Sequence, residues 1–151
     1  MKAAKLIDIG KIVVEQVEKP VLTSDKQVLV KVKAVGLCGT DLHVFKEGRS
    51  DVVLPRIMGH ELSGVIEEVG VDVTNVRIGD HVILDPVLSC GTCKICLKGH
   101  GNVCSDVKCF GVQCDGGFQE YIAVDSSKVF AYKKDIPFEI AALGEPFSIA
   151  S

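Results

Sequence analysis

Apolar and polar residues alternate with a period of two along much of the chain, which is the spacing of half-buried β-strands. The alternation is clearest over 28–33, inside a strand predicted at 26–36, and another strand is predicted at 11–20. Further strands are predicted in 60–70, 77–86, 110–125 (across a turn at 114–117) and 126–137. The pattern therefore predicts a mainly β fold.

Two stretches favour helices instead. Thr40 or Asp41 is a suitable N-cap for a short helix that ends at Gly48. In 138–151 the apolar spacing again fits a helix, and the chain stops inside that pattern, so we expect a fragment of a longer protein. Gly64, within a predicted strand, indicates a bulge or a close approach of two backbones.

The segment 89–109 lacks this periodicity and is rich in glycine, lysine and cysteine. It carries four of the seven cysteines, Cys90, Cys93, Cys96 and Cys104, with two, two and seven residues between them. Structural zinc prefers four tetrahedral thiolates, and short spacings let one loop wrap the ion. Because zinc can supply the folding energy that such a loop lacks, the spacing predicts a structural zinc site.

Other interpretations of these cysteines stay open. They are either unligated surface residues, or ligands of an iron–sulfur cluster in a small electron carrier, although the ferredoxin pattern has a shorter last gap followed by proline. Cys109 and Cys114 lie outside the group of four, and we interpret them as small buried apolar residues.

Composition and charge exclude several classes of protein. The chain has 17 Lys and Arg against 20 Asp and Glu, a net charge of −3, which is the wrong sign for a nucleic-acid or anionic-membrane partner. No apolar run approaches the ~20 residues that cross a bilayer, and no secretory signal is visible. An odd number of cysteines without such a signal argues against a disulfide framework. We expect a soluble, cytoplasmic protein.

Cys38 and the pair His60 and Glu61 stand apart in the sequence, each at the end of a predicted strand. A catalytic zinc needs two or three protein ligands and one open position, which a thiolate, an imidazole and a carboxylate would provide. Taken separately, each of these motifs is more typical of a core or surface role.

Taken together, the motifs resemble those of the zinc-dependent medium-chain alcohol and polyol dehydrogenases. The resemblance covers the whole chain: GLCGTDLH at 36–43, GHELSGVIEEVG at 59–70, GDHV at 79–82, the four-cysteine spacing, GGFQEY at 116–121, and Glu145-Pro146. Glu61 and the segment 145–147 are most similar to the branch of sorbitol, threonine and sugar-acid dehydrogenases.

The resemblance implies two zinc ions per chain. Cys38, His60 and Glu61 would bind a catalytic zinc, and Glu145 would reach that zinc or the substrate. Cys90, Cys93, Cys96 and Cys104 would bind the structural zinc.

It also implies residues for proton transfer. Thr40 would hydrogen-bond the substrate hydroxyl, and His43 would pass the proton to solvent through the cofactor ribose, for which an unperturbed pKa of ~6.5 is suitable. Asp41 would orient the loop from outside the ligand set.

The fold implied is a GroES-like β-barrel over 1–151, with a zinc lobe at about 88–110. Residues 138–151 would begin the connection to a Rossmann domain that binds NAD or NADP. That domain carries a Gly-x-Gly-x-x-Gly turn, which this chain lacks, so the resemblance implies the N-terminal catalytic domain alone, inactive by itself.

The leading hypothesis is a polyol or sugar-acid dehydrogenase that acts on a small molecule and forms a homo-oligomer at full length. An L-threonine or simple alcohol dehydrogenase of the same family is the alternative. A stand-alone zinc-binding module without catalysis is a further alternative from a different class.

Overall fold

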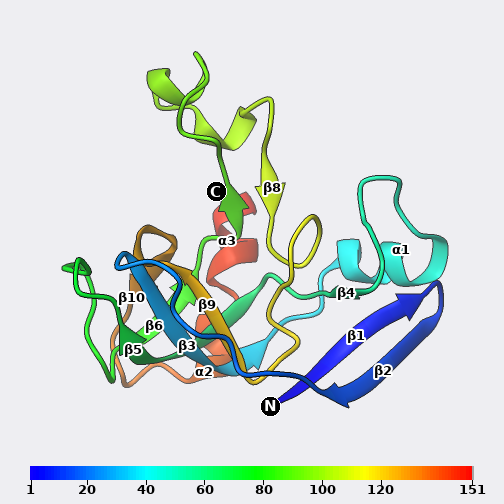
Figure 1. Cartoon of the computed structure of the whole chain (residues 1–151), viewed down its shortest axis with the longest axis horizontal. Helices are drawn as coiled ribbons and strands as arrows, with labels where there is room; N and C mark the ends of the chain where they lie inside the picture. Colours follow the sequence, from blue (N-terminus) through cyan, green and yellow to red (C-terminus); the bar gives the residue numbers. More distant parts are fainter. Residues whose placement is uncertain (151) are drawn as a thin grey trace.

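The computed structural model describes residues 1–150 and confirms a mainly β architecture (Figure 1). Two antiparallel sheets dominate it, one with the strand order β10-β6-β5-β3-β9 and one with the order β2-β1-β4. The larger sheet contains β3 (Gln27–Val35), β5 (Leu62–Val69), β6 (His81–Leu84), β9 (Tyr121–Asp125) and β10 (Val129–Ala131). The smaller sheet contains β1 (Lys2–Asp8), β2 (Lys11–Gln16) and β4 (Arg56–Ile57).

The larger sheet is stabilised by a continuous apolar core. Its members from β3, β5, β6 and β9 are Val28, Val30, Leu62, Ile66, Val82, Leu84, Ile122 and Val124. Full burial of one aliphatic side chain contributes ~1.5–3 kcal/mol. The antiparallel register pairs Val35 with Leu62, so the residues that follow β3 and those that precede β5 meet at one edge of the sheet.

A second, smaller core lies between α1 (Gly39–Glu47) and the smaller sheet, where Leu6, Val44 and Met58 are buried together. The predicted N-cap of this helix is wrong. Cys38 is the N-cap, and Asp41 lies in the first turn, where its Oδ2 accepts a hydrogen bond from the Cys38 amide at 3.0 Å. Gly48 ends the helix as predicted, with a φ of 73° that favours glycine.

The prediction of one strand region over 110–125 is only partly confirmed, because β9 begins at Tyr121. Residues 110–114 form a tight turn instead, in which the amides of Val112 and Gln113 both donate to the Cys109 carbonyl. Gly116 is then packed against the backbone of Gly59, which leaves no room for a side chain. The strand β1 was not among the predicted strands.

The predicted C-terminal helix is two helices, α2 (Phe138–Ala141) and α3 (Gly144–Ala150), and its final position, Ser151, lies outside the described residues. Pro146 explains the break, because proline lacks an amide hydrogen and is tolerated only in the first turn of a helix. No helix within residues 1–150 is long and apolar enough to cross a membrane.

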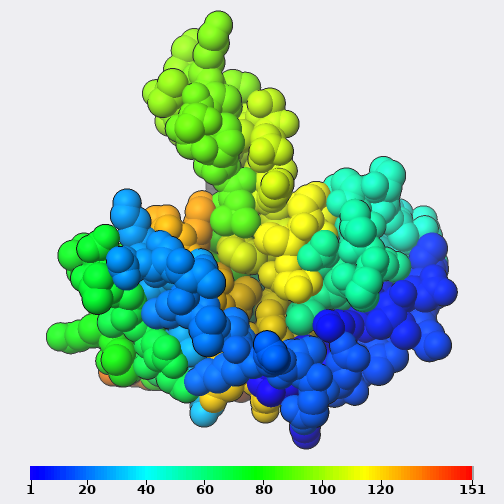
Figure 2. All heavy atoms as spheres, viewed as in Figure 1, coloured from blue at the N-terminus to red at the C-terminus, as the bar shows by residue number. Residues whose placement is uncertain are grey.

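A separate lobe projects from the body of the molecule (Figures 1 and 2). Its base is the two-stranded sheet of β7 (Val87–Leu88) and β8 (Lys108–Cys109), which pair in antiparallel register. Beyond that base, the only helical turns described are the short 3₁₀ helices η1 (Cys96–Lys98) and η2 (Gly101–Val103). Neither contains a fully buried side chain, so the lobe has almost no apolar core of its own.

Gly64 has both features that the sequence indicates. The register of β3 against β5 shifts between Val32 and Ala34, opposite Gly64, and a Cβ on Gly64 would lie 2.5 Å from the Lys31 carbonyl oxygen. Because backbone atoms in a paired strand cannot move aside, we expect Gly64→Ala to lower the free energy of unfolding by ~1–3 kcal/mol. Gly39→Ala is the matched control, since nothing lies within 4 Å of its Cβ position, and it should change stability by no more than ~1 kcal/mol. Equal stability of the two variants in urea unfolding would contradict this account.

Candidate metal centres and the cleft beside them

The first candidate centre forms where β3 ends and β5 begins. Cys38 follows β3, and His60 and Glu61 precede β5, so the antiparallel pairing brings residues distant in sequence together. One ligand atom from each of the three side chains lies within 4.8 Å of the others. The structure therefore assembles the thiol, imidazole and carboxylate that the sequence motifs name separately.

The burial of this group fits a bound cation. His60 is 6% exposed and Glu61 is 7% exposed, yet no cationic side chain within residues 1–150 forms an ion pair with Glu61. The buried Nδ1 of His60 has no hydrogen-bond partner among the same residues. A largely buried carboxylate without a cationic partner is costly. A divalent metal at this point would offset that cost, and the donor set of sulfur, nitrogen and oxygen suits zinc.

Asp41 holds the two halves of the centre together. It is only 2% exposed, and its Oδ2 accepts from the Cys38 amide at 3.0 Å while its Oδ1 accepts from the Gly59 amide at 3.2 Å. The same Oδ1 lies 3.9 Å from Nδ1 of His60. One carboxylate thus fixes the backbone beside Cys38 and beside His60.

Close packing positions Glu61 as well. The Gly36 amide donates to the Glu61 carbonyl at 2.7 Å, and a Cβ on Gly36 would overlap the Glu61 carboxylate. Glycine at this position lets the carboxylate lie against the end of β3 and face the Cys38 loop.

A cleft of about 550 Å³ opens beside this centre, within the usual size range of ligand sites. Thr40, His60 and Glu145 line it, together with residues of the loop after α1, of the lobe and of the turn that follows β8. Burial raises the pKa of Glu145, an effect that the nearby Glu61 strengthens and His60 opposes. Thr40 and Glu145 thus line the same cleft as His60, and the roles that the resemblance implies for them stay predictions.

His43 lies apart from this cleft. Its side chain is 52% exposed on α1, with Nδ1 3.5 Å from Oε2 of Glu47 one turn later. It is not among the residues that line the cleft.

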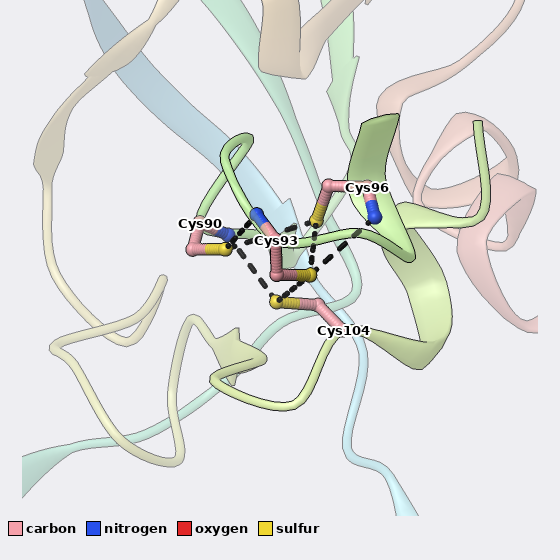
Figure 3. A group of neighbouring side chains, drawn as sticks. All are labelled: Cys90, Cys93, Cys96 and Cys104. Carbon is pink, nitrogen blue, oxygen red and sulfur yellow. Dashed lines mark hydrogen bonds between the residues drawn. The ribbon is translucent and has the colours of Figure 1, made fainter. Parts of the chain in front are cut away.

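The second candidate centre is in the lobe, where Cys90, Cys93, Cys96 and Cys104 converge (Figure 3). All four thiols are free. The sulfur atoms of Cys93 and Cys96 are 3.5 Å apart, and Cys90–Cys96 and Cys93–Cys104 are each 3.9 Å apart. A tetrahedral site with zinc–sulfur bonds of ~2.3 Å requires sulfur–sulfur distances of about 3.8 Å, so the observed spacing fits zinc.

Backbone amides also prepare the sulfurs to carry negative charge. The amide of Cys93 donates to Sγ of Cys90 at 3.3 Å, that of Cys96 to Sγ of Cys93 at 3.4 Å, and that of Asp106 to Sγ of Cys104 at 3.3 Å. Donors from Thr92 and Cys93 lower the pKa of the Cys90 thiol to about 6, whereas burial raises that of Cys96 to about 11. Hydrogen bonds of this kind favour thiolates.

The mainly β fold, the Cys-His-Glu centre and the four-cysteine lobe together define a domain of the zinc-type dehydrogenase class. The family profile of the alcohol dehydrogenase GroES-like domain matches residues 24–134. The chain belongs to this family.

Relatives with established names agree with this assignment. The chain is 40% identical over 136 residues to the starvation-sensing protein RspB of Escherichia coli, covering 89% of this chain and 40% of the relative. It is also 40% identical to sorbitol dehydrogenase of Bacillus subtilis, covering 99% of this chain and 43% of that protein. The chain thus spans about 40% of the length of these relatives.

Solved structures show the same likeness. The crystal structure of galactitol-1-phosphate dehydrogenase from E. coli superposes with a TM-score of 0.93 at 37% identity, covering 99% of this chain and 43% of that one. The rspB alcohol dehydrogenase of E. coli, solved with NADH, gives 0.91 at 37% identity over 99% of this chain and 43% of that one. The implied fold and family are therefore confirmed.

Proposed function

We propose that this chain is the N-terminal catalytic domain of a zinc-dependent NAD(P) oxidoreductase that oxidises a secondary hydroxyl of a polyol, sugar alcohol or sugar acid. The observation that carries the proposal is the buried convergence of Cys38, His60 and Glu61 beside a cleft of ligand size. These three side chains would hold the catalytic zinc. Zinc there supplies a Lewis acid that favours the deprotonated form of a substrate hydroxyl.

The residues around this centre have separate roles in the proposal. Thr40, which lines the cleft, hydrogen-bonds the substrate hydroxyl. Glu145, on α3, contacts the zinc or the substrate. His43 passes the proton to solvent, and its exposed position on α1 supports release to water rather than direct contact with substrate. Asp41 positions both ligand loops without touching substrate.

The cysteine lobe has a structural role in the proposal. Cys90, Cys93, Cys96 and Cys104 hold a second zinc, which orders a lobe that has almost no apolar core. The closed set of four sulfurs leaves no open position for chemistry. An iron–sulfur electron carrier is a weaker alternative, because it gives no role to the Cys38 centre.

The remaining elements of the reaction lie outside the 151 residues. A nicotinamide cofactor, NAD or NADP, would bind in a Rossmann domain that follows α3, and the full-length enzyme would be a cytoplasmic homo-oligomer. Because the hydride acceptor is held by that domain, we expect the chain alone to be inactive.

L-threonine is the second candidate substrate. L-threonine 3-dehydrogenase of Caldanaerobacter subterraneus is 40% identical to this chain over 127 residues, with 82% of this chain and 37% of that protein covered. That identity equals the value for sorbitol dehydrogenase.

The proposal is tested on the product of the whole gene that encodes this chain. We expect NAD- or NADP-dependent oxidation of at least one polyol or sugar acid, with lower kcat/KM for L-threonine and for 2-propanol. A preference for L-threonine would support the second candidate. Zinc binding without oxidation of any alcohol would contradict both and favour a zinc-binding module.

A further inference from the structure

The cleft beside the Cys38 centre also has a polar wall, formed by a connected network of Arg49, Asp51 and Gln113. On the loop after α1, Arg49 donates from Nε to Oδ1 of Asp51 at 2.9 Å and from Nη2 to Oδ2 at 2.5 Å. Nε2 of Gln113 donates to the same Oδ2 at 2.8 Å. All three residues line the cleft, although Asp51 and Gln113 are 62 positions apart in sequence.

A backbone hydrogen bond also holds Gln113, the third member of the network, in place. The amide of Cys109 donates to Oε1 of Gln113 at 2.8 Å, so both ends of the Gln113 side chain are fixed. The Arg49 guanidinium lowers the pKa of Asp51, which keeps its carboxylate ionised. These hydrogen bonds restrain the three side chains before any ligand binds, which reduces the entropy lost on binding.

Most of the hydrogen-bonding groups that remain free in this network are donors. A guanidinium has five N–H donors, and two of those of Arg49, one on Nε and one on Nη2, are hydrogen-bonded to Asp51. Asp51 already accepts three hydrogen bonds, out of about four positions on a carboxylate. A ligand at this wall therefore finds mainly N–H groups, which suit oxygen acceptors.

Lys108 adds a second cation to the lining of the same cleft. It lies on β8 at the base of the lobe, lines the cleft, and forms no ion pair with any residue in 1–150. Of the charged side chains that line the cleft, Arg49 and Lys108 are cationic and Asp51 and Glu145 are acidic, and Asp51 is already paired with Arg49. The free donors of Arg49 and the ammonium of Lys108 favour an anionic ligand group here.

We propose that Arg49 and Lys108 are specificity-determining residues that bind an oxyanion, carboxylate or phosphate, at the distal end of a hydroxylated substrate chain. This inference rests on the proposed function, because it assumes that the reacting hydroxyl lies at the Cys38 centre. Gln113 and Asp51 act as positioning residues that hold Arg49 toward the cleft. A neutral polyol of the same length gains less from this wall.

The test compares compounds with the same carbon chain and different ends: sorbitol, D-gluconate and sorbitol 6-phosphate. With the whole-gene product, we expect kcat/KM for at least one of the two anions to exceed that for sorbitol by about tenfold or more. Preference between gluconate and the phosphate identifies which oxyanion is bound. Arg49→Gln and Lys108→Gln should each remove most of that preference, mainly through a higher KM for the anionic substrates.

Lys46→Gln is the matched control, because Lys46 is an exposed cation on α1 that does not line the cleft. This variant should leave the ratio of kcat/KM for the anionic substrate to kcat/KM for sorbitol unchanged. A sorbitol preference, or an anion preference that both Arg49→Gln and Lys108→Gln retain, would overturn the inference.

A binding measurement separates this inference from the proposed function. In the zinc-loaded chain without cofactor, gluconate or sorbitol 6-phosphate should shift NMR signals of Arg49, Lys108 and Gln113 at lower concentration than sorbitol does. Such binding, together with no dehydrogenase activity of the whole-gene product, would support the anion site and contradict the proposed function. Dehydrogenase activity of the whole-gene product without anion-dependent shifts at these residues would support the proposed function and contradict the anion site.

Discussion

Replacing Cys38 by Ala is expected to remove one zinc per chain and to lower kcat/KM of the full-length enzyme by at least about 1,000-fold. Loss of a Lewis acid removes several kcal/mol of transition-state stabilisation, and each 1.36 kcal/mol corresponds to a factor of ten in rate. The fold should persist, because Cys38 is only partly buried and its amide, which Ala retains, makes the hydrogen bond to Asp41. Zinc content, the circular dichroism spectrum and kcat/KM measure the three effects.

His43→Ala is the comparison that separates metal binding from proton transfer. Its side chain lies on the exposed face of α1 and outside the group of ligand atoms, so both zinc ions should remain bound. Loss of a general acid–base group costs ~10²–10⁴-fold in rate, and we expect the lower part of this range because water can reach the site. Loss of a zinc ion, or full activity across the pH range, would show that His43 is an ordinary solvated histidine.

Cys93→Ser is expected to release the second zinc and unfold the lobe locally. Sγ of Cys93 lies 3.5 Å from that of Cys96 and 3.9 Å from that of Cys104, so it is central to the group of four. Metal binding is the main source of order in such a lobe, and structural zinc can contribute ~10–16 kcal/mol to folding. We expect amide hydrogen exchange between Ser89 and Cys109 to accelerate by about tenfold or more, while the strands of the larger sheet retain their protection.

Cys114→Ser is the matched control, since it makes the same chemical change in a cysteine outside the group of four. Its zinc content and the exchange rates of the lobe should equal those of the unchanged protein. Unaltered protection of the lobe in Cys93→Ser would count against a structural zinc site there. Because β8 and the lobe contribute Lys108 and Asn102 to the cleft, the same variant should also raise KM of the full-length enzyme.

Both candidate centres use residue types that the sequence already identifies. They differ in whether the spacing of those residues in the sequence is enough to predict that the side chains meet. The four cysteines lie within one short segment, and their spacing by itself predicts a four-sulfur site that the structure assembles. Cys38 and His60 are 22 positions apart. Their approach depends on the pairing of Val35 with Leu62, which no local pattern specifies.

The polar network of the cleft gives no comparable signal in the sequence. Arg49 and Asp51 are ordinary charged loop residues until Gln113 reaches them from a distant turn. That turn is set by Gly111, whose φ is 77°, and by the close packing of Gly116 on Gly59. Contacts of this kind arise from the packing of loops and are not encoded by periodicity.

The sequence by itself determined the strands with clear alternation, the glycine that ends α1, and the residue types of both groups of possible metal ligands. These features depend on neighbours within a few positions, where backbone propensity and ligand spacing act directly. Only the tertiary structure decided that Cys38 caps α1, that the C-terminal helix divides before Pro146, and that Glu145 meets His60 in one cleft. Those outcomes depend on strand register and burial, which are properties of contacts between residues far apart in the chain.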